Sequence, residues 1–305
     1  MTEVQVSLLA NRLTSAPPSE LRRAVELAEG ARLDGLGTGD HVSFYIGAGA
    51  DGLLAATSIL TASDHLSAVV GVYLLPLRHP VLVARQLADL ARLAPGRLVL
   101  GVGIGGEDPH EVEICGVDPR TRGRRMDECL EVVRGLLTGD PLDYGGEFFQ
   151  LEQAVIIPAP AEPVPLLVGG RSDAAIRRAG RLGDGWYGIW VSPRRYGEAL
   201  ESMETAAEES ERSGVEWHNA LNVWCGVGPT VADARSFVAP AMEAFYQMPY
   251  ERFEKWSPSG TPEHVAAFLA PYVDAGCHTF NVIACGASLE DEVEAVAEIR
   301  EHLVG

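Results

Sequence analysis

Short apolar runs alternate with longer segments of helical period along the whole chain, and this alternation constrains the fold more than any other feature. Gly or Pro bounds each run, which is typical of buried strands. Between the runs, apolar residues such as Val83, Leu87 and Leu90 recur three or four positions apart, which indicates one face of a helix. The eight runs that we interpret as strands are residues 4–9, 33–39, 67–75, 97–104, 164–168, 186–190, 220–227 and 279–284.

Repeated strand–helix units of this kind are typical of a parallel sheet. They predict an α/β fold, a single (β/α)8 TIM barrel spanning residues 1–305, with a doubly wound open sheet as the alternative. Two connections are longer than a barrel needs. They are residues 105–163 after the fourth strand, with a hairpin turn at 144–147, and residues 228–276 after the seventh. Insertions at the carboxyl ends of barrel strands normally shape an active site.

The charge balance and the cysteines narrow the class of protein. With 43 acidic and 24 basic side chains, the net charge of -19 disfavours nucleic acid and anionic membranes as partners. No apolar run approaches the ~18 residues that span a bilayer, and we expect a cytoplasmic protein. The five cysteines are odd in number and form no Cys-x-x-Cys pair, so we expect reduced thiols rather than disulfides or a zinc site.

The stretch "LVGGRSDAAIRRAGRLGDGW" is residues 167–186. Gly169 and Gly170 follow a buried strand and permit a tight turn with exposed backbone amides. Ser172 or Asp173 then caps a helix. The amides and the positive end of the helix macrodipole favour a phosphate, to which Arg171 or Ser172 adds a side-chain contact. An ordinary turn with nothing bound is the alternative.

The stretch "LGTGDHVSF" places Asp40 and His41 just past the second predicted strand. Barrel enzymes keep their chemistry on this face, where a histidine exchanges protons near neutral pH and a neighbouring carboxylate orients it or binds a cofactor hydroxyl. The same dipeptide at Asp64-His65 precedes a strand, so the dipeptide gains meaning only from its position.

The stretch "GVGIGGEDPHE" holds Gly101, Gly103 and Gly106 in the spacing of a dinucleotide fingerprint. That fingerprint belongs after a first strand and opens a helix, whereas here the strand is the fourth and Glu-Asp-Pro-His follows instead of a helix start. Backbone without side chains at this strand end instead lets a flat ring approach closely. We interpret the acidic cluster beyond it as a solvated loop, and no metal site is predicted. The cluster is Glu107, Asp108, His110 and Glu111.

The stretch "RTRGRRMDECL" gathers four arginines at a helix start, where the helix dipole disfavours cations. This placement indicates an anionic partner. Simple pairing with Asp118, Asp127 or Glu128 is the alternative.

Taken together, these segments resemble the luciferase-like monooxygenase superfamily of flavin- and deazaflavin-dependent oxidoreductases. The similarity runs through "GDH" at 39–41, "LLPLRHPVLVARQLADLARLAPGRLVLGVGIG" at 74–105, "GVDPRTRGRRMDECLEVVRGLL" at 116–137, "LLVGGRSDAAIRRAGRLGDGW" at 166–186 and, more faintly, "GTPEHVAAFLAPYVDAGC" at 260–277. The resemblance implies an enzyme that acts on a small organic substrate and forms a homodimer. It also implies that the mouth of the barrel holds coenzyme F420 or, alternatively, FMN.

The resemblance also assigns positions. It implies His41 and Asp40 as the catalytic pair, and a phosphate on the loop after the fifth strand, with Trp186 closing the far side of that pocket. It further implies that the end of the third strand, often a non-proline cis peptide in the family, buttresses the ring. The implied cofactor-binding residues are Gly71, Val72, Tyr73, Gly103, Arg124, Val168, Gly169, Gly170, Arg171 and Trp186.

The sequence departs from one branch of that family at two places. The deazaflavin sugar-phosphate and alcohol dehydrogenases have a tryptophan shortly after the Asp-His pair and a glutamate after the fourth-strand glycines, whereas this chain has Phe44 and Gly106, with Glu107 one step late. The leading hypothesis is an F420-dependent oxidoreductase that transfers a hydride to or from a small organic substrate. The alternatives are a monooxygenase using reduced FMN and oxygen, a non-catalytic flavin-binding barrel, and a phosphate-binding isomerase or aldolase, the last weakened because Lys255 is the only lysine.

Overall fold

The computed structural model describes residues 4–10, 13, 16–45, 49–106 and 108–304. Within these residues, eight parallel strands form a closed barrel in the order β1-β2-β3-β4-β7-β8-β9-β11, and β11 pairs back with β1. These strands are β1 (Gln5–Leu9), β2 (Gly35–Thr38), β3 (Ser67–Tyr73), β4 (Leu98–Val102), β7 (Leu166–Gly169), β8 (Gly185–Ile189), β9 (Ala220–Val227) and β11 (Thr279–Cys285).

The predicted (β/α)8 barrel is therefore confirmed, and the open-sheet alternative is wrong, because β8 pairs with β9 and leaves no sheet edge there. Each predicted strand overlaps an observed one, and β9 has the predicted bounds.

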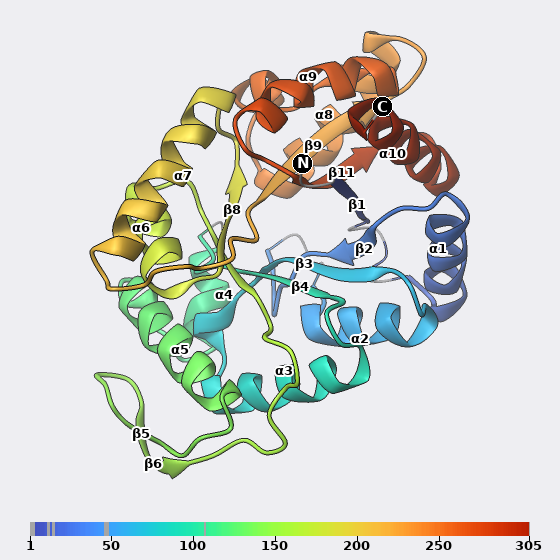
Figure 1. Ribbon diagram of the computed structural model, residues 1–305. Helices are drawn as coiled ribbons and strands as arrows, with labels where there is room; N and C mark the ends of the chain where they lie inside the picture. Colours follow the sequence, from blue (N-terminus) through green and yellow to red (C-terminus); the bar gives the residue numbers. More distant parts are fainter. Residues whose placement is uncertain (1–3, 11–12, 14–15, 46–48, 107, 305) are drawn as a thin grey trace.

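Helices surround the barrel as a ring (Figure 1). Asp51 caps α2 by accepting from the Leu53 and Leu54 amides, and Pro80 opens α3, where its missing N–H costs nothing. The ring consists of α1 (Pro18–Gly30), α2 (Gly52–Ala62), α3 (Pro80–Leu93), α5 (Arg122–Leu137), α6 (Asp173–Leu182), α7 (Pro193–Glu208), α9 (Pro262–Asp274) and α10 (Leu289–Val304).

The two long connections carry additional elements. The first holds α4 (Pro109–Ile114) and the hairpin β5 (Leu142–Gly145) with β6 (Gln150–Ala154), which projects beyond α5 in Figure 1. The predicted turn is confirmed, and the Glu128 carboxylate of α5 fixes it by accepting from the amides of residues 147–149. The second holds α8 (Val231–Tyr246) and β10 (Ser259–Gly260), which extends the sheet beside β9.

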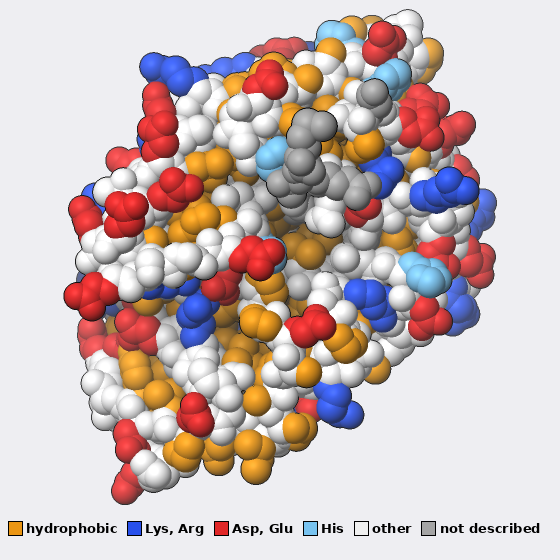
Figure 2. Space-filling model, in the orientation of Figure 1, with side chains coloured by type: hydrophobic (Ala, Val, Ile, Leu, Met, Phe, Trp, Pro, Cys, Tyr) orange, Lys and Arg blue, Asp and Glu red, His pale blue; other side chains and the backbone are white. Residues whose placement is uncertain are grey.

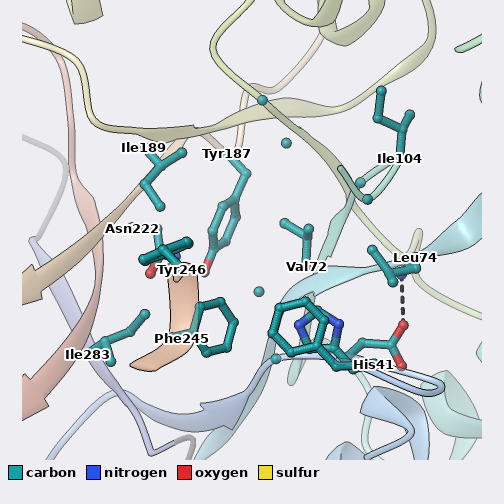
Figure 3. A pocket seen from close by; sticks show the side chains of 18 of the residues that line it. His41, Val72, Leu74, Ile104, Tyr187, Ile189, Asn222, Phe245, Tyr246 and Ile283 are labelled. Carbon is teal, nitrogen blue, oxygen red and sulfur yellow. Dashed lines mark hydrogen bonds between the residues drawn. The ribbon is translucent and has the colours of Figure 1, made fainter. Parts of the chain in front are cut away.

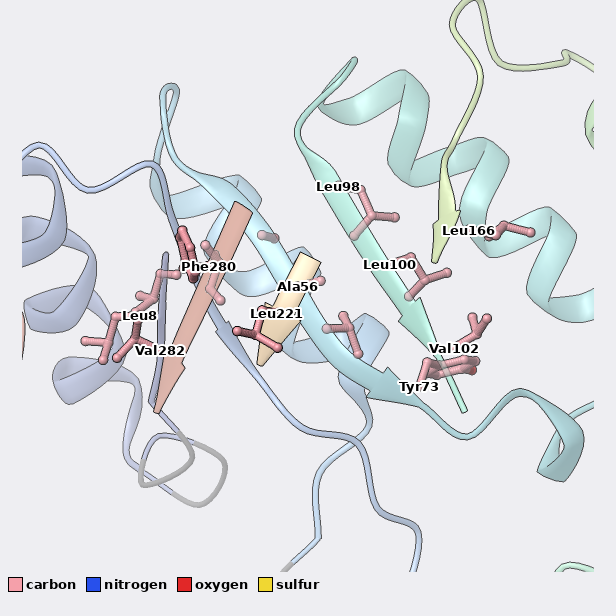
Figure 4. Close-up of a cluster of buried hydrophobic side chains, with 14 of the residues drawn as sticks. Leu8, Ala56, Tyr73, Leu98, Leu100, Val102, Leu166, Leu221, Phe280 and Val282 are labelled. Atoms are coloured by element: carbon pink, nitrogen blue, oxygen red, sulfur yellow. The ribbon is translucent and has the colours of Figure 1, made fainter. Parts of the chain in front are cut away.

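Alternation along the strands divides the core into two layers. Leu8, Leu100 and Val282 face the helices and belong to the large outer cluster (Figure 4), whereas Leu9 and Ile283 face the barrel interior. The period of two of a strand puts neighbouring residues on opposite faces, so one strand serves both layers. The inner layer is small, and the cavity described below lies above it.

The distribution of charge on the surface and the state of the cysteines are as expected from the sequence. Acidic side chains are spread around the rim of the face shown in Figure 2, as expected for a net charge of -19. None of the five cysteines forms a disulfide in the described residues. Among the described residues, no helix combines the length and the hydropathy that crossing a bilayer requires.

Candidate active site

A cavity of about 340 Å³ opens at the carboxyl ends of the strands. This volume is within the range of small-molecule sites, roughly 300–1,000 Å³. Residues from β3, β7, β8, β9 and β11, from the loops after β2, β3, β4, β7 and β8, and from the end of α8 line it (Figure 3). They are Gly39, Asp40, His41, Phe44, Gly49, Ala50, Gly71, Val72, Leu74, Gly103, Ile104, Gly105, Gly169, Gly170, Tyr187, Ile189, Trp190, Asn222, Trp224, Phe245, Tyr246 and Ile283.

His41 presents its imidazole to this cavity and is held by Glu111. Its Nδ1 lies 3.1 Å from Glu111 Oε2, and its ring stacks on Phe44 with centroids 3.9 Å apart. The other oxygen of Glu111 accepts from the Val42 and Ser43 amides at 2.6 and 3.0 Å. Burial raises the pKa of the Glu111 carboxyl, but these hydrogen bonds outweigh it and hold that pKa below its usual value. The carboxylate therefore fixes the imidazole and leaves Nε2 for a ligand.

Asp40 makes a different set of contacts from the one we expected. Its buried carboxylate accepts from both terminal nitrogens of Arg78, at 2.6 and 2.7 Å, and from the Leu74 and Gly52 amides, at 2.8 and 2.9 Å. Burial raises the pKa of the Asp40 carboxyl, and Arg78 and the two amides oppose this. Because all of these neighbours are donors, a proton on the carboxyl would have no acceptor. Asp40 thus ties the start of α2 to the end of β3, and Glu111, not Asp40, orients His41.

Val72 forms the middle of the cavity wall. The Gly71–Val72 peptide bond is cis. The Val72 side chain packs against backbone that carries no side chain, since a Cβ built on Gly103 would lie 2.4 Å from Val72 Cγ2, and one on Gly169 2.9 Å from Val72 Cγ1. The fourth-strand glycines that we expected to admit a flat ring therefore make room first for Val72, which presents an apolar surface to the cavity.

The Gly169–Gly170 turn leads directly from β7 into α6. Gly170 has φ +120°, a conformation that L side chains rarely adopt, and both glycines line the cavity. Ser172 caps the helix and accepts from the Ala175 amide, as the sequence predicts. The remaining amides of a first turn have no intrahelical acceptor, which makes this edge of the cavity suitable for an anion.

Three of the predicted cofactor residues lie in the core behind the cavity. Tyr73, Val168 and Trp186 are buried, and none of them lines the cavity. Trp186 instead donates from Nε1 to the Gly170 carbonyl at 2.6 Å, so it supports the glycine turn from the helix side. Strand alternation explains the difference, because neighbours of inward-facing residues face outward.

The two predicted arginines lie outside the cavity. Arg124 is exposed at the start of α5, and both of its hydrogen bonds, at 3.0 Å, go to Glu147 of the hairpin. Arg171 is exposed too, but its guanidinium lies 5.5 Å from the ring centre of Trp190, which lines the cavity. The rest of the arginine cluster is also bound to protein groups. Arg120 pairs with Asp118, Arg122 donates to the Pro119 carbonyl, and Arg125 donates to the Pro76 carbonyl.

The acidic cluster after β4 differs from the expected solvated loop. Asp108 and Glu111 are buried, and Asp108 caps α4 by accepting from the His110 amide at 2.9 Å, so Asp-Pro-His-Glu is a helix start after all. His110 is exposed, and Glu107 lies outside the described residues. No group of three His, Cys, Asp or Glu in the described chain is arranged to hold a metal ion. The sequence analysis did not predict that Glu111 binds His41. The N-cap pattern at Asp108 could have indicated it, because this pattern predicts a helical turn with Glu111 and Val112 on its buried side.

Aromatic side chains close the cavity on the side of α8. Trp224 Nε1 donates to the Tyr246 hydroxyl at 3.0 Å, and the Tyr45 hydroxyl donates to the Phe245 carbonyl at 2.8 Å. Phe245 also lies 5.8 Å from the His41 ring, centroid to centroid. The insertion after the seventh strand therefore supplies one wall of the site.

Comparison with known sequences identifies relatives. Residues 2–258 match the family model described as luciferase-like monooxygenase. An uncharacterized protein of Mycobacterium tuberculosis is 42% identical over 139 residues, which is 46% of this chain and 48% of that protein. The chain thus spans about half the length of the first curated relatives that it matches. The F420-dependent glucose-6-phosphate dehydrogenase of Nakamurella multipartita is 30% identical, covering 55% of this chain and 51% of the relative. The 4-hydroxyprotoasukamycin monooxygenase of Streptomyces nodosus subsp. asukaensis is 31% identical, covering 81% and 68%.

Solved structures share the fold at lower identity. An F420-dependent secondary alcohol dehydrogenase in complex with an F420-acetone adduct superposes with a TM-score of 0.86 at 19% identity, covering 99% of both chains. The F420-dependent tetrahydromethanopterin reductase of Methanopyrus kandleri gives 0.78 at 18% identity, covering 99% and 100%. These likenesses show the barrel architecture, and the family model together with the monooxygenase relative shows the family. The chain belongs to the luciferase-like monooxygenase family of oxidoreductase enzymes.

Proposed function

We propose that this chain is an F420-dependent oxidoreductase that transfers a hydride to or from a small organic substrate. The observation that carries the proposal is His41 in an otherwise largely apolar cavity, with Nδ1 bound to Glu111 and Nε2 left for a ligand. F420-dependent relatives at 27–30% identity support the choice of a deazaflavin.

The residues around the cavity fit a flat ring with a phosphorylated tail. Val72 offers an apolar surface at the middle of the wall. Beside it, Gly103 and Gly169 carry no side chain, so their backbone is open to the cavity. Gly169 and Gly170 lead to the first amides of α6, which suit the phosphate, and Arg171 lies close enough to the cavity rim to assist. Arg124 would have to leave Glu147 to do the same. When bound, a deazaflavin supplies the hydride acceptor or donor.

The protein's own task is then to handle the proton. When a hydroxyl-bearing carbon loses its hydride, the hydroxyl oxygen must lose its proton, and His41 Nε2 is the acceptor. The Glu111 carboxylate holds the Nδ1–H tautomer and stabilises the imidazolium that forms. In the reverse direction, the same imidazolium returns the proton to a carbonyl oxygen. Phe44, Phe245 and Trp224 keep bulk water away from this exchange.

Cofactor titration tests the proposal. We expect purified protein to bind coenzyme F420 with a saturable change in deazaflavin fluorescence, and to bind FMN more weakly. Tight FMN binding without F420 affinity would overturn the proposal in favour of the FMN and oxygen-dependent monooxygenase, which the monooxygenase relative supports. We also expect a homodimer, which light scattering of the same sample would test.

A further inference from the structure

Asn222 is a buried polar side chain in the cavity wall, and its carbonyl oxygen, Oδ1, stands without a hydrogen-bond donor among the described residues. It lies on β9, is 8% exposed and faces inward. A buried carbonyl oxygen that stays unpaired is unfavourable, so a ligand that supplies a donor gains affinity there. Figure 3 shows Asn222 on the side of the cavity away from His41.

A second unpaired atom lies just beyond the end of the neighbouring strand β8. Trp190 follows Ile189, which is the register partner of Asn222, and within the described structure the buried Trp190 Nε1 also has no acceptor. The site thus offers an acceptor on β9 and a donor just beyond β8. A hydroxyl group suits either atom, because it donates one hydrogen bond and accepts others.

The wall around Asn222 carries polar groups but no cation. The register partner of Asn222 on β11 is the buried Asn281, and Tyr187 also lines the cavity. Trp224, Tyr246 and Ile283 line the same part of the cavity, and no Lys or Arg is present among the described lining residues. Lys255, the only lysine, has its ammonium 4.7 Å from the ring centre of Trp256, and neither residue lines the cavity. A phosphorylated substrate would bring a doubly charged group into a wall that has nothing to pair with it.

We propose that Asn222 is the specificity-determining residue of this cavity and that the substrate is a neutral, largely apolar molecule with two polar groups. One group reacts at His41, and the other, a hydroxyl, donates to Asn222 Oδ1. The second contact deepens the proposed oxidoreductase function and rests on it for the identity of the reacting group. The same wall disfavours sugar phosphates as substrates, because it offers no cation to pair with their charge.

Binding without cofactor tests the subsite independently of the reaction. The fluorescence of Trp190 and Trp224, which line the cavity, reports occupancy of the full chain. The probes are 1,3- and 1,4-cyclohexanediol, the matched 3- and 4-methylcyclohexanols, and glucose 6-phosphate. We expect one diol to bind about tenfold more tightly than its methyl partner, and glucose 6-phosphate to bind more weakly than either.

Two variants locate the effect. Asn222→Leu should abolish the preference for the diol and leave affinity for the methyl analogue within about twofold, whereas Asn222→Asp, which keeps an oxygen acceptor in place, should retain the preference. Ile283→Val reshapes the neighbouring apolar wall without touching the amide and should retain it as well. Equal affinity of diol and methyl partner in the unmodified chain, binding of neither, an equal loss for both in Asn222→Leu, or tighter binding of glucose 6-phosphate would overturn the proposal. Diol preference without F420 binding would instead leave the subsite standing and remove the proposed function.

Discussion

Two carboxylates, those of Asp40 and Glu111, hold the loop after β2, and they do so in different ways. Asp40 binds Arg78 and two backbone amides, so it holds the loop, α2 and β3 together. Glu111 comes from α4, some 70 residues further along the chain, and binds the imidazole itself. The carboxylate adjacent in sequence is structural, and the distant one is placed to tune chemistry. Position in the sequence is a poor guide to which carboxylate orients a histidine.

The largest expected effect tests whether His41 is the proton acceptor that Glu111 orients. We expect His41→Ala to lower kcat/KM by about a thousandfold, in line with the 10²–10⁴ typical of general acid–base groups. The unfolding midpoint in urea should fall only modestly, because the ring is partly exposed, although its stacking on Phe44 and its contact with Glu111 are lost. Steady-state kinetics with F420 measures the effect. Unchanged turnover would favour a non-catalytic role for the histidine.

Asp40 should affect stability more than chemistry. We expect Asp40→Asn to lower the free energy of unfolding by about 3 kcal/mol, since it leaves the mostly buried Arg78 guanidinium with only the more exposed Asp51, 3.3 Å away, as a counter-charge. Asp89→Asn, which breaks an exposed pair with Arg85, is the control and should cost at most about 1 kcal/mol. Chemical denaturation measures both. A fully stable Asp40→Asn protein with the kinetic defect of His41→Ala would instead make Asp40 the catalytic partner.

Glu111 should show the reverse pattern. Glu111→Gln removes the negative charge that stabilises a protonated imidazole while leaving the size of the side chain unchanged. We expect kcat to fall by roughly ten- to a hundredfold, as for other residues that orient a functional histidine. A change in KM alone, with kcat intact, would contradict a positioning role.

The pH dependence of stability separates Glu111 further. Its pKa in the folded protein lies below the ordinary value of 4.5, so its contribution is fully present above that value and is lost as the pH falls through the lower folded-state value. The free energy of unfolding, measured with urea from neutral to acidic pH, should therefore fall once the pH drops below about 4.5. Glu111→Gln should flatten that part of the curve, and an unflattened curve would assign the loss to other groups.

The smallest effect concerns the phosphate edge, which extends the comparison from carboxylates to arginines. We expect Arg171→Ala to raise the dissociation constant for F420 about tenfold, because this side chain borders the cavity through Trp190. Arg124→Ala is the matched control and should stay within about twofold, since Arg124 binds Glu147 on the surface. Fluorescence titration compares the two variants. The opposite ranking would restore Arg124 as the phosphate ligand.

The positions of strands and of local turns could be predicted from the sequence alone. The apolar run at 220–227 became β9 without adjustment, and Ser172 capped α6 as its type and position indicate. Asp40 and His41 were predicted to lie at the active face because both follow a strand, and both line the cavity. These features depend on residues close together in the chain, whose preferences are local.

Which residues of a strand face the cavity and which face the helices could not be predicted in the same way. Trp186 and Val168 were expected at the cofactor, yet strand alternation turns them toward the helices, and Tyr187, beside Trp186, lines the cavity instead. The unpaired Oδ1 of Asn222 carries no signal in the sequence, since an asparagine in a strand looks the same whether its partner is a neighbour or a ligand.

The sequence by itself determined a parallel α/β barrel, its strands, and a loop with Asp40 and His41 at its mouth, because apolar periodicity and turn residues act over a few positions. Only the tertiary structure decided that Arg78 pairs with Asp40 and that Glu111 binds His41. It also decided that Asn222 Oδ1 lies in the cavity wall without a hydrogen-bond partner among the described residues. The physical reason is closure. When the barrel closes, it brings distant strand ends within hydrogen-bonding distance, and charge and burial at that point settle which groups pair.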